Sequence, residues 1–532
     1  MTLIRPRLRE YWAVLLTFLV FYEGVVAFLG QDMNADLLNY HISASYQFLH
    51  GGDLSRFAVS QRQSWFNPLA NLPSYGLIMG LPGWLASIVL AALPAANALM
   101  IYVICRRFLF TRKEWEAMLL SFACALVGGT GSFHFLVVGT TFTEAWLSAI
   151  ILFGIYLGLA AFTDDGRQPG RMLMLSGACL GAGFGLKSTN VVYAFAGIVA
   201  VTAALIASRR DFRLLTWFAV GGIVAFAVSG GWWMAKNWHD FGNPTFPMMN
   251  NVFRSRWAEP VALLDAEFLP KHWWQLFADP LAMAVGDHHR MLSTFMPNRD
   301  ARSLIGLGSA FVGLGSLIAT GLRRGVIAIP IIPLFMVAFY LSAYIGWFFL
   351  FNVERYLIPL ELLSAAMLGM VVDLFTPVRA RRTFVILLVT MALVLVTTRP
   401  IRSWRVPISA DWFALQVPPQ ASEPNTLFVM TGTGYLAWLI AFPKALGGNP
   451  DFVRVGGNLP IPHATELARV IAARIANHRG PIRSLTSTGY EATSAADLSA
   501  FGLSPAPGEC VKIISKAAPI VTCPLVRSAA MQ

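Results

Sequence analysis

Acidic and polar residues that could do chemistry gather in the segment QDMNADLLNYHISASYQFLHGG, near the start of the chain. Asp32, Asp36 and Tyr40 follow one another at intervals of four, so they share one face if a helix begins early in this segment. A carboxylate would then lie beside groups that can position a substrate. The alternative is that Asp36, or Asn34 before it, only caps a surface helix, because both residue types are frequent at helix starts.

Charged candidates recur in later segments. Glu144 ends GTTFTE, Lys187 stands in LKSTN, and Arg355 follows Glu354 in FNVERY. The planar guanidinium of Arg355 suits phosphate, because it can donate two parallel hydrogen bonds. One alternative is that Arg355 only forms a local ion pair with Glu354. Another is that its long side chain lies along apolar surface with the charge in water, and this alternative applies to Lys187 as well.

Two other segments resemble sites but predict little chemistry. GNPTFPMMN (242–250) fixes two turns around an aromatic residue, which makes it a rigid loop or an ordinary turn. Gly432-x-Gly434-x-x-Ala437 follows an expected strand, as a dinucleotide loop would. Asp451 precedes the next strand, however, whereas a ribose-binding acid should end it. The sequence has no P-loop, no H-E-x-x-H and no C-x-x-C motif.

The amino-acid composition indicates which kind of secondary structure holds these candidate residues in place. The 532 residues are 56% hydrophobic and only 13% charged, about half the charged share of a soluble protein. This excludes a disordered chain and an ordinary soluble enzyme, and it predicts a polytopic α-helical membrane protein. The net charge of +12 does not indicate nucleic acid, because most basic runs fall between apolar stretches, where topology signals lie.

The apolar stretches predict about eleven transmembrane helices. Alternation through them places nearly all short basic runs on the N-terminal side, which is therefore cytoplasmic. Gly177, Gly181 and Gly185 form a small-residue stripe that lets two helices approach closely. The expected spans are 11–29, 82–105, 115–136, 143–162, 172–186, 190–208, 214–234, 303–322, 325–350, 357–375 and 383–398.

The candidates therefore gather on the outer side, and the last residues of the chain lie there too. We predict a transmembrane domain at 1–398 and a small extracytoplasmic α/β domain at 399–532. Its expected strands are 426–430, 452–455, 511–515 and 520–523, with an amphipathic helix at 465–478. In the first outer loop, Leu37, Tyr40, Ala44 and Phe48 recur at helical spacing and could lie in the membrane interface.

Two of the five cysteines predict a disulfide. A two-residue turn at Lys516-Ala517 would pair 515 with 518 and bring Cys510 opposite Cys523. An oxidising compartment outside the cytoplasm would allow the bridge to form.

The order of these motifs resembles one family of membrane enzymes. D-L-L-N-Y-H in the first outer loop, N-x-x-x-x-G-N-P-x-F-P in mid-chain and E-R-Y-L-I-P before a late span are similar to the C-type (GT-C) glycosyltransferases, which use polyprenyl-phosphate sugars. The resemblance covers about residues 1–400. It implies an inverting transfer of a sugar to a periplasmic or lipid-linked glycan, in a bacterial inner membrane.

The resemblance also implies roles for the candidate residues. Asp36 matches the catalytic carboxylate and would act as the general base. Arg355 first, and Lys187 second, would bind the donor phosphate. The chain lacks an adjacent acidic pair, so the sequence leaves open whether a divalent metal takes part, and it implies no other cofactor. The substrate-orienting candidates are Asp32, Tyr40, His41, Glu144 and Asn243.

The implied partners are the polyprenyl-phosphate sugar, membrane lipids and a glycan, lipid or protein acceptor, with no nucleic acid. Two other functions stay open: a lipid-linked glycan ligase or polymerase, and a transporter or flippase. A transporter is expected to place its polar residues near the membrane midplane and to show two related halves. Here the candidates gather at one face and no duplicated half is evident.

Overall fold

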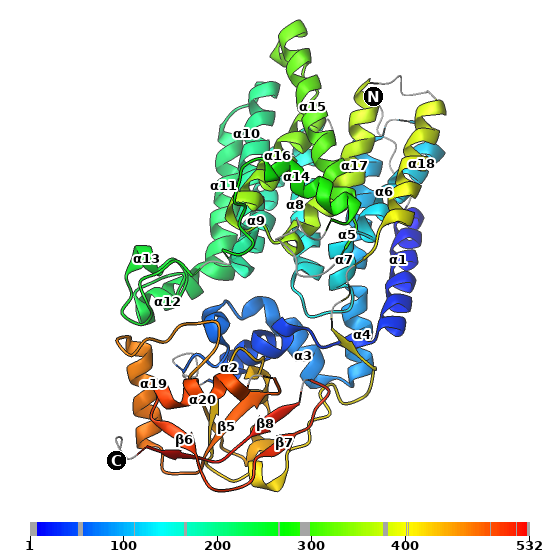
Figure 1. The fold of residues 1–532 in the computed structure, drawn as a ribbon. Helices are drawn as coiled ribbons and strands as arrows, with labels where there is room; N and C mark the ends of the chain where they lie inside the picture. Colours follow the sequence, from blue (N-terminus) through cyan, green and yellow to red (C-terminus); the bar gives the residue numbers. More distant parts are fainter. Residues whose placement is uncertain are drawn as a thin grey trace. The chain divides into compact units, whose positions relative to one another are not determined.

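The computed structural model describes most of the chain, and its helices and strands are shown in Figure 1. The described residues are 8–51, 57–110, 112–163, 168–263, 266–287, 298–375, 381–400, 402, 404–489, 491–517 and 519–528.

The chain forms two compact units that interleave in sequence. Unit 1 comprises Met1–Phe28, Ile88–Gly231 and Asp265–Ser403, and unit 2 comprises Leu29–Ser87, Trp232–Leu264 and Trp404–Gln532. The last boundary lies close to the expected one at 398, but unit 2 also takes in two segments from the first half of the chain. One reason is a short strand pair, in which β1 (Gln31–Asp32) lies antiparallel to β2 (Arg405–Val406).

Unit 1 is helical, and most of its helices are almost wholly apolar. Long apolar helices of this kind satisfy their own backbone hydrogen bonds, as a bilayer requires. Its helices are α1 (Leu8–Leu29), α5 (Ala95–Ile104), α6 (Glu114–Gly129), α7 (Ser132–Val137), α8 (Glu144–Ala161), α9 (Pro169–Leu186), α10 (Val191–Ser208), α11 (Arg213–Phe226), α14 (Gln275–Val285), α15 (Arg302–Arg324), α16 (Ile331–Leu350), α17 (Ile358–Phe375) and α18 (Arg381–Thr397), while α4 (Gly83–Ala92) leads into it from unit 2.

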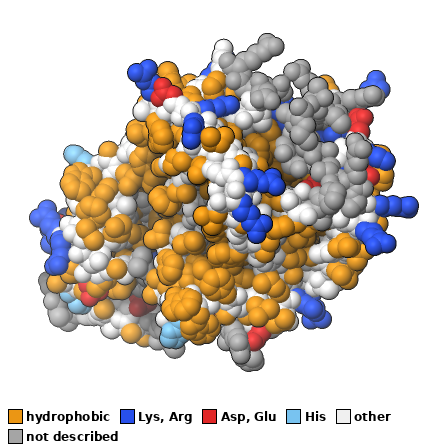
Figure 2. Space-filling model, turned by 90° about the horizontal axis from the view of Figure 1, so that it is seen from above, with side chains coloured by type: hydrophobic (Ala, Val, Ile, Leu, Met, Phe, Trp, Pro, Cys, Tyr) orange, Lys and Arg blue, Asp and Glu red, His pale blue; other side chains and the backbone are white. Residues whose placement is uncertain are grey.

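Among the described residues, eight helical stretches are long and apolar enough to cross a membrane. A helix is present at each of the eleven expected spans, but α6 has 16 residues, α18 has 17, and α9 is rich in glycine. The membrane-protein class is confirmed, whereas the count of eleven is not. Figure 2, seen from above the view of Figure 1, shows more Lys and Arg than Asp and Glu side chains around an apolar surface.

The expected glycine stripe lies where two helices meet most closely. A Cβ at Gly177 would come 1.9 Å from the Phe218 carbonyl oxygen, and one at Gly181 would come 2.1 Å from the Gly222 carbonyl oxygen. Both distances are far shorter than a van der Waals contact. Only glycine therefore allows α9 and α11 to pack backbone against backbone.

Unit 2 is built around a five-stranded mixed sheet in the order β4-β3-β5-β8-β7. The β3 strand pairs in parallel with β4 and β5, and β8 runs antiparallel to β5 and β7. The strands are β3 (Leu427–Met430), β4 (Asp451–Arg454), β5 (Ile482–Ser487), β7 (Val511–Ile513) and β8 (Ile520–Thr522), with β6 (Leu503–Pro505) and β9 (Leu525–Arg527) as a separate pair.

Helices complete unit 2. Its longer helices are α2 (Ile42–His50), α3 (Leu72–Gly80), α12 (Trp232–Phe241), α19 (Glu466–Asn477) and α20 (Glu491–Ala500), and α13 (Asn250–Phe253) is a single turn. The expected amphipathic helix corresponds to α19. The Thr465 side chain begins it by accepting a hydrogen bond from the Ala468 backbone nitrogen at 3.2 Å.

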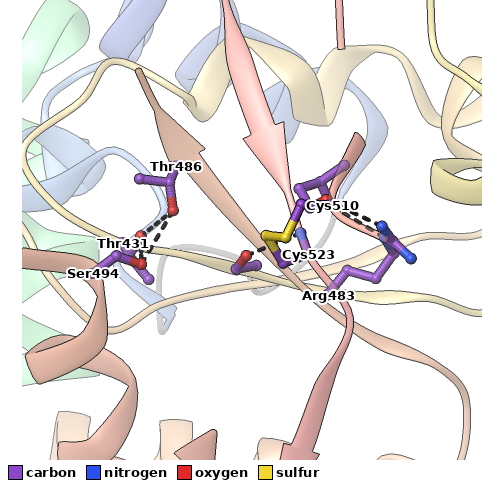
Figure 3. Close-up of a disulfide and its surroundings, with 8 residues drawn as sticks. Thr431, Arg483, Thr486, Ser494, Cys510 and Cys523 are labelled. Carbon is purple, nitrogen blue, oxygen red and sulfur yellow. Dashed lines mark hydrogen bonds between the residues drawn. A yellow bond between two sulfur atoms is a disulfide. The ribbon is translucent and has the colours of Figure 1, made fainter. Parts of the chain in front are cut away.

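Figure 3 shows the disulfide between Cys510 and Cys523, which closes the β7–β8 hairpin. The register pairs Val511 with Thr522 and Ile513 with Ile520, as the expected turn requires.

The glycine loop after β3 is structural. The buried Arg454 guanidinium donates to the carbonyl oxygens of Gly432, at 2.8 Å, and Gly434, at 3.1 Å. The Gly432 N–H donates to the Asp497 carboxylate at 2.7 Å. The loop leads into a short 3₁₀ helix, η11 (Ala437–Ala441), and not into an α-helix, so it lacks the α-helix N-terminus on which a dinucleotide phosphate would rest.

Candidate functional site

Three candidates from distant parts of the sequence meet in unit 1. Glu144 is the first residue of α8, Lys187 follows the last residue of α9, and Arg355 lies in the 3₁₀ turn η9 (Glu354–Leu357) that leads into α17. The Oε1 atom of Glu144 lies 2.7 Å from the Lys187 Nζ atom. The same atom lies 3.0 Å from the Arg355 Nε atom. One carboxylate oxygen thus holds two cations.

The cluster carries a net positive charge that solvent can still reach. The Glu144 side chain is 6% exposed and that of Arg355 is 18% exposed, while Lys187 is 15% exposed. The formal charges of these three side chains sum to +1. Partial burial lowers the local dielectric constant and strengthens the attraction of such a cluster for an anion.

Aromatic rings fix the positions of both cations. The Arg355 Cζ atom lies 4.1 Å from the centre of the Phe142 ring, and Lys187 Nζ lies 5.3 Å from that of Tyr356. These cation–π contacts restrict side chains that would otherwise be mobile. The backbone of η9 is fixed as well, because Trp347 Nε1 donates to the Val353 carbonyl oxygen at 2.7 Å.

A buried polar network positions the segment that leads to Glu144, and the sequence did not single it out. Glu361 accepts hydrogen bonds from the backbone nitrogens of Phe133, at 3.0 Å, and His134, at 2.8 Å. It thereby caps the N-terminus of α7. A Cβ at Gly131 would lie 2.2 Å from the Glu361 carboxyl carbon, so glycine is required there. An acidic residue in an apolar span was the available signal.

A second carboxyl group missed from the sequence is Asp279 on α14. Burial raises the pKa of Asp279 to about 6, although hydrogen bonds from Asn352 and Gln275 lower it in part. It occupies an apolar helix that is shorter than a span, which is why hydropathy drew no attention to it.

The first-loop candidates lie in unit 2, where Asp36 and Tyr40 interact. The Tyr40 hydroxyl donates to the Asp36 carboxylate at 3.3 Å. Asn34, rather than Asp36, caps the helix, because its Oδ1 accepts from the Leu37 backbone nitrogen at 2.9 Å. Asp36 lies in the first turn and is partly exposed.

Three other candidates are buried among protein groups. Asp32 is fully buried and accepts from the Asn34 side chain at 2.6 Å, and His41 is 1% exposed. Asn243 is fully buried and donates to the Met248 carbonyl oxygen at 2.8 Å. Their burial suits support of the loops better than direct contact with a substrate.

The apolar stripe of the first loop does not lie on a membrane surface, so that prediction is wrong. Leu37 is fully buried, and Tyr40 and Ala44 are each 8% exposed. Only Phe48, at 41% exposed, points outward. The stripe packs against η11 (Ala437–Ala441) inside unit 2, because a helix stripe can cover a protein core as well as a lipid surface.

The structure thus groups Glu144, Lys187 and Arg355 in unit 1, and Asp36 with Tyr40 in unit 2. Within the described part of the chain, no group of three or more His, Cys, Asp or Glu side chains could hold a metal ion.

Comparison with known proteins gives only distant likenesses. No protein-family model matches the chain, and no curated protein matches it. The solved arabinofuranosyltransferase AftD from Mycobacteria is similar with a TM-score of 0.47 and 13% identity, over 98% of this chain and 42% of AftD. ArnT from Cupriavidus metallidurans, solved with undecaprenyl phosphate, has a TM-score of 0.43 and 13% identity, over 99% of each chain. The chain spans less than half of AftD, and both scores are too low to establish a fold or a function.

Proposed function

We propose that this chain is an inverting membrane glycosyltransferase of the GT-C type. It moves a sugar from a polyprenyl-phosphate donor to a glycan, lipid or protein acceptor. The observation that carries the proposal is the Glu144–Lys187–Arg355 cluster. Each of its three residues lies next to an apolar helix in the sequence, so the cluster suits a lipid with a charged headgroup.

The cluster suits a phosphate that leaves during the reaction. When the bond between the sugar and the phosphate breaks, negative charge builds up on the phosphate oxygens. Arg355 and Lys187 are held in place before the reaction by Glu144 and by aromatic rings. Pre-positioned cations stabilise the developing charge without reorganisation. The planar guanidinium of Arg355 is suited to phosphate, because it can donate two parallel hydrogen bonds to its oxygens.

Asp36 supplies the base in this proposal. Its carboxylate takes the proton of the acceptor hydroxyl while that oxygen attacks the anomeric carbon from the face opposite the phosphate. The configuration at the carbon inverts, and polyprenyl phosphate leaves. Tyr40 holds the carboxylate by donating to it at 3.3 Å. No step of this scheme requires a metal ion.

The proposal includes a topology: a cytoplasmic N-terminus, with Asp36, Glu144, Lys187 and Arg355 on the periplasmic side of a bacterial inner membrane. Basic connectors such as Arg209–Arg213 support this orientation. Reporter fusions after Arg213, Gln275 and Ser409 should read inside, outside and outside.

The direct test is turnover in proteoliposomes with a radiolabelled polyprenyl-phosphate sugar. A glycosyltransferase releases polyprenyl phosphate and labels an acceptor. A flippase moves the intact lipid between leaflets and leaves the bond between sugar and phosphate unbroken. Translocation without cleavage, across a panel of donor sugars and acceptors, would contradict the proposal.

A further inference from the structure

Unit 2 exposes large apolar side chains on α12 and around α13. Trp238 is 55% exposed, Met249 is 45% exposed and Val252 is 59% exposed. On the same unit, Trp232 is 36% exposed and lies against Phe48, with ring centres 5.9 Å apart. We call these five residues the apolar surface. Large exposed apolar groups of this kind mark a site of contact with another molecule or with a membrane.

The turn that carries this surface is rigid. Asn250 is fully buried, and its Nδ2 donates to the carbonyl oxygens of Ser255 and Ala258, both at 2.9 Å. Its Oδ1 accepts from the Ser255 backbone nitrogen at 2.8 Å. Behind the turn, the Phe241 and Phe246 rings stack with centres 4.6 Å apart.

The backbone bends sharply to expose these residues. Met249 has a φ of 52° and Arg254 a φ of 55°, on either side of α13. Residues with a Cβ adopt this left-handed conformation at a cost. The network around Asn250 offsets that cost, so the exposure of Met249 and Val252 is a built feature of the fold.

The length of the preceding helix indicates what covers the surface. Arg213–Phe241 is a helical stretch of 29 residues, which is roughly 43 Å long at 1.5 Å per residue. The hydrocarbon core of a bilayer is only about 30 Å thick. If Arg213 lies at one surface, the chain reaches the opposite headgroup layer near Trp232, at the start of α12.

The residue types fit a headgroup layer better than a protein partner. Tryptophan concentrates at membrane interfaces, because its ring is apolar and its N–H is polar. Trp238 and Phe253 meet edge to face, with centres 5.9 Å apart, and join α12 to α13. The exposed Arg254 lies beside them, where its charge complements lipid phosphate.

We infer that the apolar surface of α12 and α13 lies in the headgroup layer of a phospholipid bilayer and anchors unit 2 to it. The inference does not depend on the proposed enzymatic activity. The membrane contact expected for the Leu37–Phe48 stripe is thus assigned to the apolar surface instead. Phe48 is the one residue that belongs to both the stripe and the apolar surface.

The test uses the full-length protein in lipid nanodiscs, with one added cysteine carrying an environment-sensitive fluorophore. Val252→Cys places the probe on the surface. Val526→Cys is the matched control, because Val526 is also an exposed valine of unit 2, at 43%, but lies on β9. The free native cysteines Cys105 and Cys124 are buried and Cys179 is half-buried, so a brief labelling reaction favours the added site.

The inference predicts a blue-shifted emission at position 252 relative to 526. It also predicts stronger quenching at 252 by spin-labelled phospholipid, and weaker quenching by aqueous iodide. Equal emission and equal quenching at the two positions would overturn it. A blue shift at 252 without quenching by the labelled lipid would overturn it as well, because a protein contact would then cover the surface. Both labelled variants must elute from a size-exclusion column at the volume of the folded natural protein.

Discussion

The Nε atom of Arg355 lies 3.0 Å from the Oε1 atom of Glu144, although the two residues are 211 positions apart in the sequence. Glu144 therefore sets the place of the guanidinium, and the partial exposure of Arg355 leaves it able to bind an anion. Lys187 shares the same oxygen, which makes the pair of cations one unit.

The first prediction concerns the phosphate site. Arg355→Ala should weaken binding of the donor lipid and slow turnover. The expected loss of transition-state stabilisation is about 2–4 kcal/mol. Compared with Arg355→Ala, Arg355→Lys should recover only part of the donor affinity and of the turnover rate, because an ammonium group lacks the planar pair of N–H donors of a guanidinium. Donor binding and single-turnover rates in folded, purified variants measure this. Unchanged donor binding in Arg355→Ala would refute the assignment.

Close packing of α9 on α11 predicts a destabilised Gly181→Ala variant. The new Cβ would lie 2.1 Å from the Gly222 carbonyl oxygen, so the helices must separate, at about 1–3 kcal/mol for an overpacked contact. Gly308→Ala on α15 is the control, because nothing lies within 4 Å of a Cβ at that position. Melting temperatures in detergent compare the two. A Gly181→Ala protein as stable as Gly308→Ala would show that α9 and α11 do not pack in this way.

The raised pKa of Asp279 predicts a pH-dependent stability. Burial raises this pKa from 3.8 to about 6, so folding favours the protonated acid. The contribution of Asp279 to the free energy of unfolding is fully present below pH 3.8 and is lost as the pH rises through about 6. Relative to the natural protein, Asp279→Asn should gain stability as the pH rises from about 4 to about 7. Melting temperatures across this range measure the difference, and a constant difference would argue against a buried, protonated Asp279.

The bridge joins Cys510 and Cys523, which are 13 positions apart, and should stabilise unit 2 by about 3 kcal/mol through loop closure. In native, unreduced protein, alkylation followed by mass spectrometry should find both sulfurs protected. Modification of both at the rate of a free exposed thiol would mean that no bridge forms. The double variant Cys510→Ser, Cys523→Ser should unfold at a lower temperature than the oxidised protein.

Patterns of apolar and turn residues predicted much of the fold. The glycine stripe and the amphipathic helix were readable from their helical spacing, and four strands from short runs rich in apolar and β-branched residues. The central strand β5 was missed, because Ile482–Ser487 reads IRSLTS and alternates only weakly. All six of its residues are nevertheless buried. Its polar side chains find partners that no local pattern reveals, such as Thr486 with Thr431 and Ser494 (Figure 3).

The candidate site was predicted in its residue types but not in its pairings. Charge and loop position singled out Glu144, Lys187 and Arg355, yet nothing in the sequence pairs them, because their contact depends on the packing of α8, α9 and α17. Asp32 and Asp36 looked alike in sequence. Their difference, full burial against partial exposure, arises from the pairing of β1 with β2, more than 370 residues along the chain.

The proposed glycosyl transfer depends on Asp36 as its general base. Asp36→Asn keeps the size of the side chain and its hydrogen bond from Tyr40 but loses the basicity. Tyr40→Phe is the matched control, since it removes only that 3.3 Å hydrogen bond and should cost far less. The decisive measurement is the single-turnover rate of Asp36→Asn with a radiolabelled polyprenyl-phosphate sugar, alongside its donor affinity. If Asp36 is the general base, the rate falls by about 10²–10⁴-fold while donor binding stays intact. A near-normal rate would show that Asp36 is not the base.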